Sequence, residues 1–473
     1  MRAGRTVNSS QNGEAQTGRG AVHGGTRQFR ATGASGVGTQ PNNTHRTGQT
    51  APSRMNTVPS GVGDQNVRTP ESFSDKVGKP AAEVVRGTLR GYRTVVEQKN
   101  IVREKGSPDY VFLVLVLVLI AFGTIMVYSA SYAYANNVYG DSYHFIFRQI
   151  VFIIIGSIGM FLCYLITPRG YIMMTPLAYA VCVCAMIAVQ IIGVEHGGAK
   201  RWINLGFTDL QPSEFMKLGL ILLLACYINI HYEKITDKNN LGKASLYGVA
   251  GPLAITLITC LLVIIQKHLS GTIIMFSIGV IMIYVSGAPL RWLYIGAGVG
   301  GGAAALFSII TPYTRRRLDT WLHPENDPTD AGYQTLQGLY AIGSGGLFGE
   351  GLGNSYQKHH FVSQPQNDFI FTIICEELGY IGAMAVIALF VLLIWRGVRI
   401  AMKAPDVFST MLVLGIIGKT ALQVVLNIAV VTNSIPNTGI SLPFFSYGGS
   451  ALIVAMAEMG IVLSVSRFSK LQK

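Results

Sequence analysis

Apolar runs of about 20 residues recur along this chain, and they constrain its fold more than any other feature. Each run is long enough to cross about 30 Å of hydrocarbon as an α-helix. Half of the 473 residues are hydrophobic and only 13% are charged, which is too little charge to cover a soluble protein of this size. Since a segment that crosses lipid must satisfy its own backbone hydrogen bonds, the sequence predicts an all-α integral membrane protein.

Hydropathy predicts about ten transmembrane helices. Their approximate ranges are 110–131, 149–166, 171–193, 213–230, 246–266, 271–287, 292–311, 369–395, 407–432 and 448–466. The distribution of Lys and Arg near the span ends predicts that the N- and C-termini are cytoplasmic. The long loop 312–368, between spans 7 and 8, is then extracytoplasmic, and its glycines favour a folded, partly re-entrant loop.

Residues 1–107 differ in composition from the rest of the chain, with many small and polar residues and few large apolar ones. This composition predicts a disordered tail, followed by a membrane domain over 108–473. The tail holds 16 Lys and Arg against 7 Asp and Glu, and no nucleic-acid-binding motif accompanies them. We therefore expect a cytoplasmic tail attracted to membrane lipids and no nucleic-acid partner. Helical spacing in 80–105 is typical of a helix on the membrane surface.

Several charged residues lie inside predicted spans, where charge is costly unless it is paired or open to water. Gln211, Glu214 and Lys217 follow i, i+3 spacing on one helix face, so Glu214 and Lys217 can pair. The residues either support a site or pair for structural reasons alone. Lys419 and Glu458, on the ninth and tenth spans, are predicted to form an ion pair between helices.

Four segments together resemble the SEDS family (shape, elongation, division and sporulation proteins of the FtsW, RodA and SpoVE types). They are GAKRWINLGFTDLQPSEFMKLG at 198–219, RRRLDTWLHPENDPTDAGYQTLQGLYAIGSGGLFGEGLGN at 315–354, NDFIFTIICEELGYIGA at 367–383 and PNTGISLPFFSYGGSALI at 436–453. The resemblance covers about 110–470 and leaves out the tail. It implies a peptidoglycan glycosyltransferase in the cell membrane, acting on lipid II at the extracytoplasmic face during division, elongation or sporulation. It also implies a class B penicillin-binding protein transpeptidase as partner.

Such a reaction requires a base for the attacking sugar hydroxyl and cations for the polyprenyl pyrophosphate leaving group. Asp368 matches the functional aspartate of the family's T-D-F-I-F pattern, with Asn367 at the Thr position. We therefore expect Asp368 to be the catalytic base. The alternative is an N-cap on the eighth span, a position that Asp favours.

Basic residues on the outer side are candidates for binding the pyrophosphate, because the planar guanidinium of Arg matches phosphate oxygens. The candidates are Arg315, Arg316, Arg317, Lys200, Arg201 and Lys217. Any one of the outer residues can instead anchor a helix end at the headgroups.

Further residues are predicted to support this site. Glu376 and Glu377 follow Asp368 by about two turns, where they can raise its pKa or bind a cation. A divalent cation, Mg²⁺ or Mn²⁺, is compatible with the chemistry, and no metal ligands are assigned. His268 or Lys267 takes roughly the place of an aspartate that the family usually carries in a Q-P-D pattern, so the chain can also be a degenerate or specialised paralogue.

The loop 433–450 contains Phe444, Phe445 and Tyr447. These rings suit contact with a sugar face or an aromatic belt at the membrane interface.

Two other functions compete with the glycosyltransferase. Many spans with buried charges and broken helices also describe a lipid flippase or transporter, and the altered Q-P-D segment is compatible with a catalytically silent scaffold for a cell-wall synthase.

Overall fold

The computed structural model describes residues 106–196, 199–204, 206, 208–237, 239–296, 298, 318–326, 331–359, 361–362 and 364–468. Every described residue belongs to one compact unit, which lies within Pro70–Lys473. The predicted tail 1–107, with its surface helix at 80–105, lies outside the described residues except for Gly106 and Ser107. Most of the predicted span 292–311 lies outside them as well.

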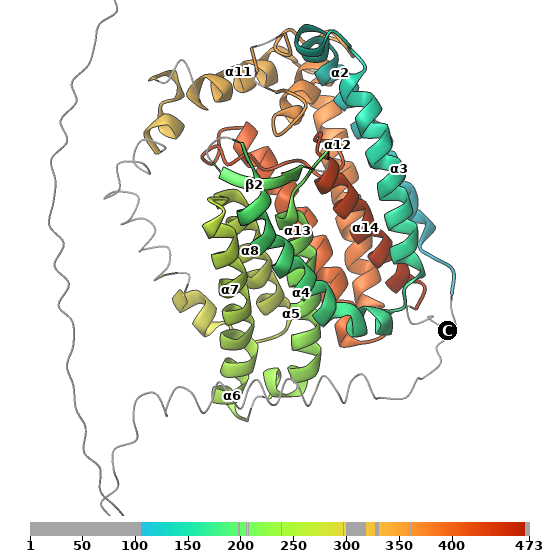
Figure 1. Cartoon of the computed structure of the whole chain (residues 1–473), viewed down its shortest axis with the longest axis vertical. Coiled ribbons are helices and arrows are strands. Elements are labelled where there is room, and N and C mark those ends of the chain that lie inside the picture. The colour runs from blue at the N-terminus through green and yellow to red at the C-terminus, as the bar shows by residue number, and fades with distance from the viewer. Residues whose placement is uncertain are drawn as a thin grey trace, which may run out of the picture. The chain divides into compact units, whose positions relative to one another are not determined.

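The described residues form long helices and one small sheet (Figure 1). The helices are α2 (Tyr110–Tyr139), α3 (His144–Leu165), α4 (Pro168–Ile192), α5 (Pro212–Ile235), α6 (Leu241–Ser245), α7 (Gly251–Ile265), α8 (Leu269–Val285), α11 (Ala331–Ser344), α12 (Ile370–Met402), α13 (Val407–Val431) and α14 (Gly449–Ser466). A π-helical turn, η1 (Leu246–Ala250), joins α6 to α7, and a 3-10 turn, η2 (Pro324–Asn326), precedes α11.

Eight helical segments are long and apolar enough to cross a membrane, and α8 is a shorter apolar helix. The continuous segment Leu241–Ile265, from α6 through η1 to α7, counts as one of the eight. These segments coincide with nine of the predicted spans. The mostly helical, multi-pass architecture is therefore confirmed, while the total of ten stays a prediction because 292–311 is largely outside the described residues.

Local sequence signals fix several helix ends. Asp109 begins α2 by accepting a hydrogen bond from the backbone N–H of Phe112 at 3.0 Å. Asp406 caps α13 in the same way, through the N–H of Ser409 at 2.8 Å. Gly140 ends α2 with a φ of 70°, a left-handed conformation that favours glycine. The end of α2 lies beyond the predicted residue 131, because the less apolar segment SYAYANNVY continues the helix.

The helices differ in how much they are enclosed by their neighbours. The most apolar stretch of α14 is 78% buried and that of α5 is 72% buried, against 17% in α4. At Gly460 of α14 a side chain would meet the backbone of Met160 in α3, so only glycine allows this close approach. Helices α5 and α14 therefore form the interior, and α4 presents apolar surface outward.

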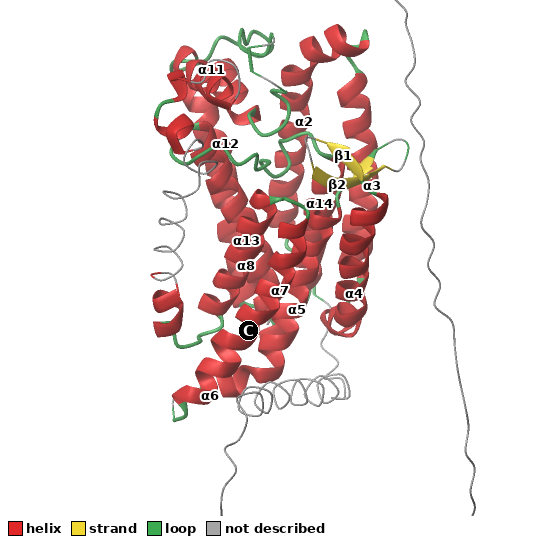
Figure 2. Cartoon of the chain, turned by 60° about the vertical axis from the view of Figure 1, so that its left-hand side comes forward, coloured by secondary structure: helices red, strands yellow, loops and turns green. Residues whose placement is uncertain are grey.

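The sheet follows α4 and has the order β1 (Val194–His196), β2 (Ala199–Asn204) and β3 (Asp209–Leu210), with antiparallel neighbours. Figure 2 shows it, in yellow, beside the helix ends in the upper half of the bundle, toward α11 and away from α6. Backbone pairing sets Glu195 opposite Lys200 and Asn204 opposite Asp209. The sheet thereby holds the chain that leads into α5.

The two ends of α12 mark the two faces of the protein. Asp368 lies just before its start, whereas Arg396, near its end, forms an ion pair with Asp109 at 2.9 Å. At that second end the N–H of Gly106 also donates to the carbonyl of Arg467 at 2.8 Å. Since α12 runs from Ile370 to Met402, its length separates Asp368 from the two described chain ends. Asp368 and the described chain ends therefore lie at opposite ends of α12, while the extracytoplasmic side of Asp368 stays a prediction.

Helix α12 is interrupted at Gly379, where φ is 68° and ψ is −168°. The glycine-rich loop after α11 fills this break. The N–H groups of Glu350 and Gly351 donate to the carbonyls of Glu376 and Glu377 at 2.9 and 3.0 Å. The N–H of Tyr380 in turn donates to a loop carbonyl, that of Gly346, at 2.9 Å. The described part of the predicted loop is therefore folded, and it supports the short helical segment that follows Asp368.

Candidate active site

Asp368 is held through its backbone by a side chain from another helix. Asn427 of α13 donates from Nδ2 to the carbonyls of Asp368 and Ile440, both at 2.7 Å. Asn427 is fully buried, so its amide is shielded from water. One amide thus fixes Asp368 to the loop 432–448, which connects α13 to α14.

The carboxylate of Asp368 does not cap α12. The N-cap residue is Phe369, and no side-chain hydrogen bond caps the helix. The predicted alternative role of Asp368 as an N-cap is therefore wrong. Its Oδ2 instead lies 3.5 Å from the point where a Cβ on Gly439 would stand, so this carboxylate faces the glycine of the loop 432–448.

The surroundings of Asp368 favour its protonated form. Burial raises the pKa of its carboxyl above the ordinary aspartate value, and its own backbone N–H partly opposes the shift. A carboxylate with a raised pKa is a stronger base once it is ionised. Together with its lack of a capping bond, this makes Asp368 chemically suited to accept a proton.

The loop 432–448 joins several parts of the predicted site. The hydroxyl of Ser270, at the start of α8, donates to the carbonyl of Thr438. The N–H of Tyr447 donates to the carbonyl of Gln366 at 2.8 Å. The indole of Trp321 donates to the carbonyl of Asn433 at 2.9 Å. The fold therefore brings together the segments near 270, 321, 366 and 438, which are far apart in the sequence.

Phe444 and Phe445 do not take the role that the sequence suggested. Both are buried, at 2% and 0% exposure, and the Phe445 ring packs against Phe122 and Phe390. The prediction that they contact sugar or the membrane interface is wrong, because they fill the core beneath the loop. Tyr447 is half-buried and packs edge-on against Phe145.

The turn at 266–268 lies between α7 and α8 and holds the residues that the sequence resemblance sets in place of a Q-P-D segment. Arg201 of β2 donates to the carbonyls of Gln266 and Lys267, and the Nδ1 of His268 lies 3.4 Å from the hydroxyl of Ser213. Burial, with the charge of Arg201, lowers the pKa of His268 to about 4. His268 is therefore neutral near pH 7 and acts there as a hydrogen-bonding group, and Arg201 binds this turn.

The charges predicted inside the spans form two buried ion pairs. Lys217 pairs with Glu214 at 2.7 Å within α5, and Lys419 of α13 pairs with Glu458 of α14 at 2.6 Å. Both predicted pairs are confirmed. The four charges lie near enough to act on one another electrostatically, so they connect three helices. Gln211 lies just before α5, and its backbone N–H donates to the hydroxyl of Ser450 of α14 at 3.1 Å.

Glu376 and Glu377 bind the glycine-rich loop. Both oxygens of Glu376 accept bonds from the segment 355–357. Glu377 pairs with the buried Lys358 at 2.7 Å and accepts from the hydroxyl of Ser129 at 2.6 Å. All four carboxylate oxygens thus have protein donors, which leaves them poorly suited to a cation. Neither glutamate is among the groups that shift the pKa of Asp368, so the suggested electrostatic role is not seen.

The remaining predicted site residues are only partly accounted for. Arg315, Arg316 and Arg317 lie outside the described residues. Lys200 is exposed on β2, within the sheet that leads to α5. Among the described residues, no three His, Cys, Asp or Glu side chains form a group that could hold a metal ion.

Sequence reasoning missed two residues that organise the site, Asn427 and Lys358. Asn427 is an amide within an otherwise apolar span, and this alone signals a buried hydrogen-bonding role. Lys358 carried no such signal, because it lies in a polar loop and its partner is 19 residues away along the chain. A count of loop charges cannot identify a buried pair of this kind.

The fold and site define a class of protein: a multi-pass membrane protein with a partly buried aspartate at one face and paired charges in its interior. The family model for FtsW, RodA and SpoVE proteins, described as "Cell cycle protein", matches residues 109–471. The chain therefore belongs to this family, also called SEDS, which confirms the resemblance in its sequence.

Known relatives cover nearly the same region. Stage V sporulation protein E of Bacillus subtilis strain 168 is 39% identical over 371 residues, which cover 78% of this chain and 99% of that protein. A protein of Trichlorobacter lovleyi named "Probable peptidoglycan glycosyltransferase FtsW" is 36% identical and covers 77% of this chain and 94% of its own length.

Solved structures show the same fold. A chain from the structure described as "Structural coordination of polymerization and crosslinking by a peptidoglycan synthase complex" matches with a TM-score of 0.63 and 26% identity, over 76% of this chain and 98% of that one. The rod shape determining protein RodA of Thermus thermophilus matches with a TM-score of 0.57 and 27% identity, over 77% and 98%.

Proposed function

We propose that this protein is a peptidoglycan glycosyltransferase that polymerises lipid II. Its membership of the family, and relatives named for this activity, support the reaction class. The observation that carries the assignment to a residue is the environment of Asp368: a partly buried carboxylate, free of helix capping, with a raised pKa.

Asp368 accepts the proton from the 4-hydroxyl of one lipid-linked sugar. The oxygen attacks the anomeric carbon of a second sugar from the face opposite its pyrophosphate, which inverts the configuration. A new C–O bond forms, and the bond to the pyrophosphate breaks. The polyprenyl pyrophosphate leaves with the bonding electrons, and Asp368 holds the proton.

The charge that grows on the leaving group requires cations to stabilise it. Lys200 is the described residue best suited to this role, because its side chain is exposed. Arg315, Arg316 and Arg317 are proposed to act with it, and a bound Mg²⁺ or Mn²⁺ would serve the same purpose. Arg201 contributes by holding the turn 266–268.

We further propose that the active face is extracytoplasmic and that the enzyme works with a class B penicillin-binding protein. The distribution of Lys and Arg supports the orientation. The likeness to a chain from a peptidoglycan synthase complex supports the partnership.

The deciding experiment incubates purified protein and its transpeptidase partner with lipid II and separates the glycan products by gel electrophoresis. Wild type is expected to make polymer and Asp368→Ala to make none. Glu325→Gln is the matched control, because this carboxylate is exposed and contacts only His323 at 3.4 Å among the described residues.

Polymer from both wild type and Asp368→Ala would reject Asp368 as the base. If neither makes polymer and lipid II moves across vesicles that contain the protein, the chain is a flippase. Absence of both activities, with the partner still bound, would identify a scaffold.

A further inference from the structure

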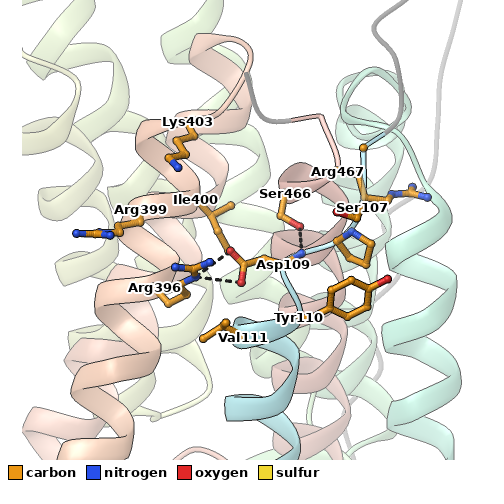
Figure 3. Close-up of a pocket in the computed structure, with 12 residues that line it drawn as sticks. Ser107, Asp109, Tyr110, Val111, Arg396, Arg399, Ile400, Lys403, Ser466 and Arg467 are labelled. Atoms are coloured by element: carbon orange, nitrogen blue, oxygen red, sulfur yellow. Dashed lines mark hydrogen bonds and ion pairs between the residues drawn. The ribbon is translucent and has the colours of Figure 1, made fainter. Parts of the chain in front are cut away.

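A cavity of about 390 Å³ lies at the opposite end of α12 from Asp368. It is bounded by the start of α2 and the ends of α12 and α14 (Figure 3). Its charged lining residues are Asp109, Arg396, Arg399, Lys403 and Arg467. The cavity therefore has no part in the reaction proposed at Asp368.

The single carboxylate of the lining is already satisfied. Asp109 accepts from the N–H of Phe112, and the Nε of Arg396 lies 3.0 and 2.9 Å from its two oxygens. Arg467 is also engaged, since it donates to the carbonyl of Tyr164 at 2.6 Å and stacks over that ring. The Nε of Arg467 is buried without a hydrogen-bond partner. The cationic groups considered for a ligand are the Nη atoms of Arg396, the guanidinium of Arg399 and the Nζ of Lys403.

These three residues follow a spacing of three and four, so they share one face of the last turns of α12. The guanidinium carbon of Arg399 lies 4.1 Å from the centroid of the Trp395 ring. For Lys403 Nζ and the Nη atoms of Arg396, no protein acceptor is found within the part of the chain that the structure describes. Figure 3 shows Arg396 directed toward Asp109, with Arg399 pointing away from the aspartate and Lys403 farther along α12.

The ordinary reasons for basic residues at a helix end account for only part of this charge. A helix C-terminus carries about half a negative charge, and α12 and α14 both end here. The N-terminus of α2 carries a similar positive charge at the same place and cancels one of them. Four cationic side chains therefore face one carboxylate and a net helix-terminus charge of about half a negative unit. Arg396 is 30% exposed, too enclosed for a residue that only reaches into the headgroups.

Apolar surface adjoins the cavity. Val111 and Val114 of α2 are 53% and 56% exposed, and Trp395 and Met402 of α12 are 49% and 71% exposed. In a membrane-spanning bundle such side chains contact acyl chains. A ligand that places phosphate in the cavity can therefore lay hydrocarbon along α2 and α12.

We propose that this cavity binds a phosphate group, and that the ligand is an anionic phospholipid of the leaflet opposite Asp368. Arg396, Arg399 and Lys403 hold the phosphate through charge-assisted hydrogen bonds. The acyl chains lie along the exposed faces of α2 and α12. A lipid bound here would contact both the start of α2 and the end of α12.

The test uses the full chain purified in a neutral detergent, with short-chain phosphatidylglycerol as probe and native mass spectrometry as readout. The variant is Arg399→Gln with Lys403→Gln, which leaves the Arg396–Asp109 pair intact. The matched control is Lys243→Gln with Arg291→Gln, which removes two charges from the same face outside the cavity. The cavity variant is expected to bind the lipid about tenfold or more weakly, and the control is expected to bind as wild type does.

Equal binding by the cavity variant and the control would overturn the proposal. A second arm adds inorganic phosphate. If phosphate displaces the lipid and itself binds with the same dependence on Arg399 and Lys403, the site accepts phosphate from soluble sources too. If phosphate has no effect while the variant loses the lipid, the lipid is the ligand. Should the double variant not fold, Lys403→Gln alone, at an exposed side chain, must weaken binding, and wild-type binding would reject the site.

Discussion

Asp368 owes its chemistry to its position two residues before a helix. A residue one position later would cap α12, whereas Asp368 lies in the preceding turn and faces Gly439. The carboxylate is therefore free of helix capping, as its proposed role as a base requires, and partial burial raises its pKa. Both properties depend on Asn427, which fixes the backbone of Asp368 from α13.

The pH dependence of polymerisation should reveal the raised pKa of Asp368. A base must be ionised to act, so the rate falls as pH falls through the pKa in the folded protein. An ordinary aspartate has a pKa of about 4. Because burial raises the pKa of Asp368, we expect the acidic limb of kcat/KM to lie above that pH. His268→Gln should leave the limb in place, since the pKa of His268 is about 4. A rate that stays constant down to pH 4 would contradict the shift.

Asn427→Ala should slow polymerisation while the protein stays folded. The substitution removes the donor that joins Asp368 to Ile440, and a displaced base costs about ten- to hundredfold in kcat. The KM for lipid II should change little, because Asn427 is buried away from the substrate. Thr432→Ala is the control, since its hydroxyl bonds the nearby chain at the end of the same helix. A loss confined to KM would show that Asn427 acts on binding instead.

At the scale of elements, α12 consists of two helical segments that meet at a break at Gly379. The short segment after Asp368 ends at Gly379, and the glycine-rich loop supplies the backbone partners that the break removes. Glu376 and Glu377 fasten the same loop through their side chains. The position of Asp368 therefore depends on a contact between α12 and a loop that precedes it.

Gly379→Ala should destabilise the protein and abolish polymerisation. A Cβ here would stand 2.4 Å from the backbone nitrogen of Gly349, and the φ of 68° strains any other residue. Strain of this kind costs about 1–3 kcal/mol before the steric clash is added. The melting temperature in detergent measures the effect. Gly159→Ala in α3 is the control, because its Cβ would meet nothing within 4 Å, and equal melting temperatures for the two variants would contradict the strained break.

Across the whole molecule, the sequence predicted what hydropathy and spacing control. It located the described spans and the pairs Glu214–Lys217 and Lys419–Glu458, because charge in an apolar span has few ways to be satisfied. It did not predict the broken α12, since the bonds that fill the break join backbone groups of distant segments. The burial of Phe444 and Phe445 was missed for a related reason: loop residues usually lie on the surface.

The opposite placement of Asp368 and the chain ends predicts which loops are accessible from each side. Ser434→Cys, in the loop beside Asp368, should react with a membrane-impermeant maleimide in intact spheroplasts. Asn239→Cys, between α5 and α6, should react only after the membrane is opened. Both positions are exposed in the structure. The reverse pattern would place Asp368 on the cytoplasmic side and exclude the proposed orientation.

The role of Asp368 is tested most directly by measuring binding and turnover of lipid II separately in Asp368→Asn. This substitution keeps the size of the side chain and removes the base. We expect turnover to fall about a hundredfold or more, with the affinity for lipid II nearly unchanged and Asp368→Glu retaining part of the rate. Wild-type turnover by Asp368→Asn, or a loss of affinity that accounts for the whole defect, would contradict Asp368 as the base.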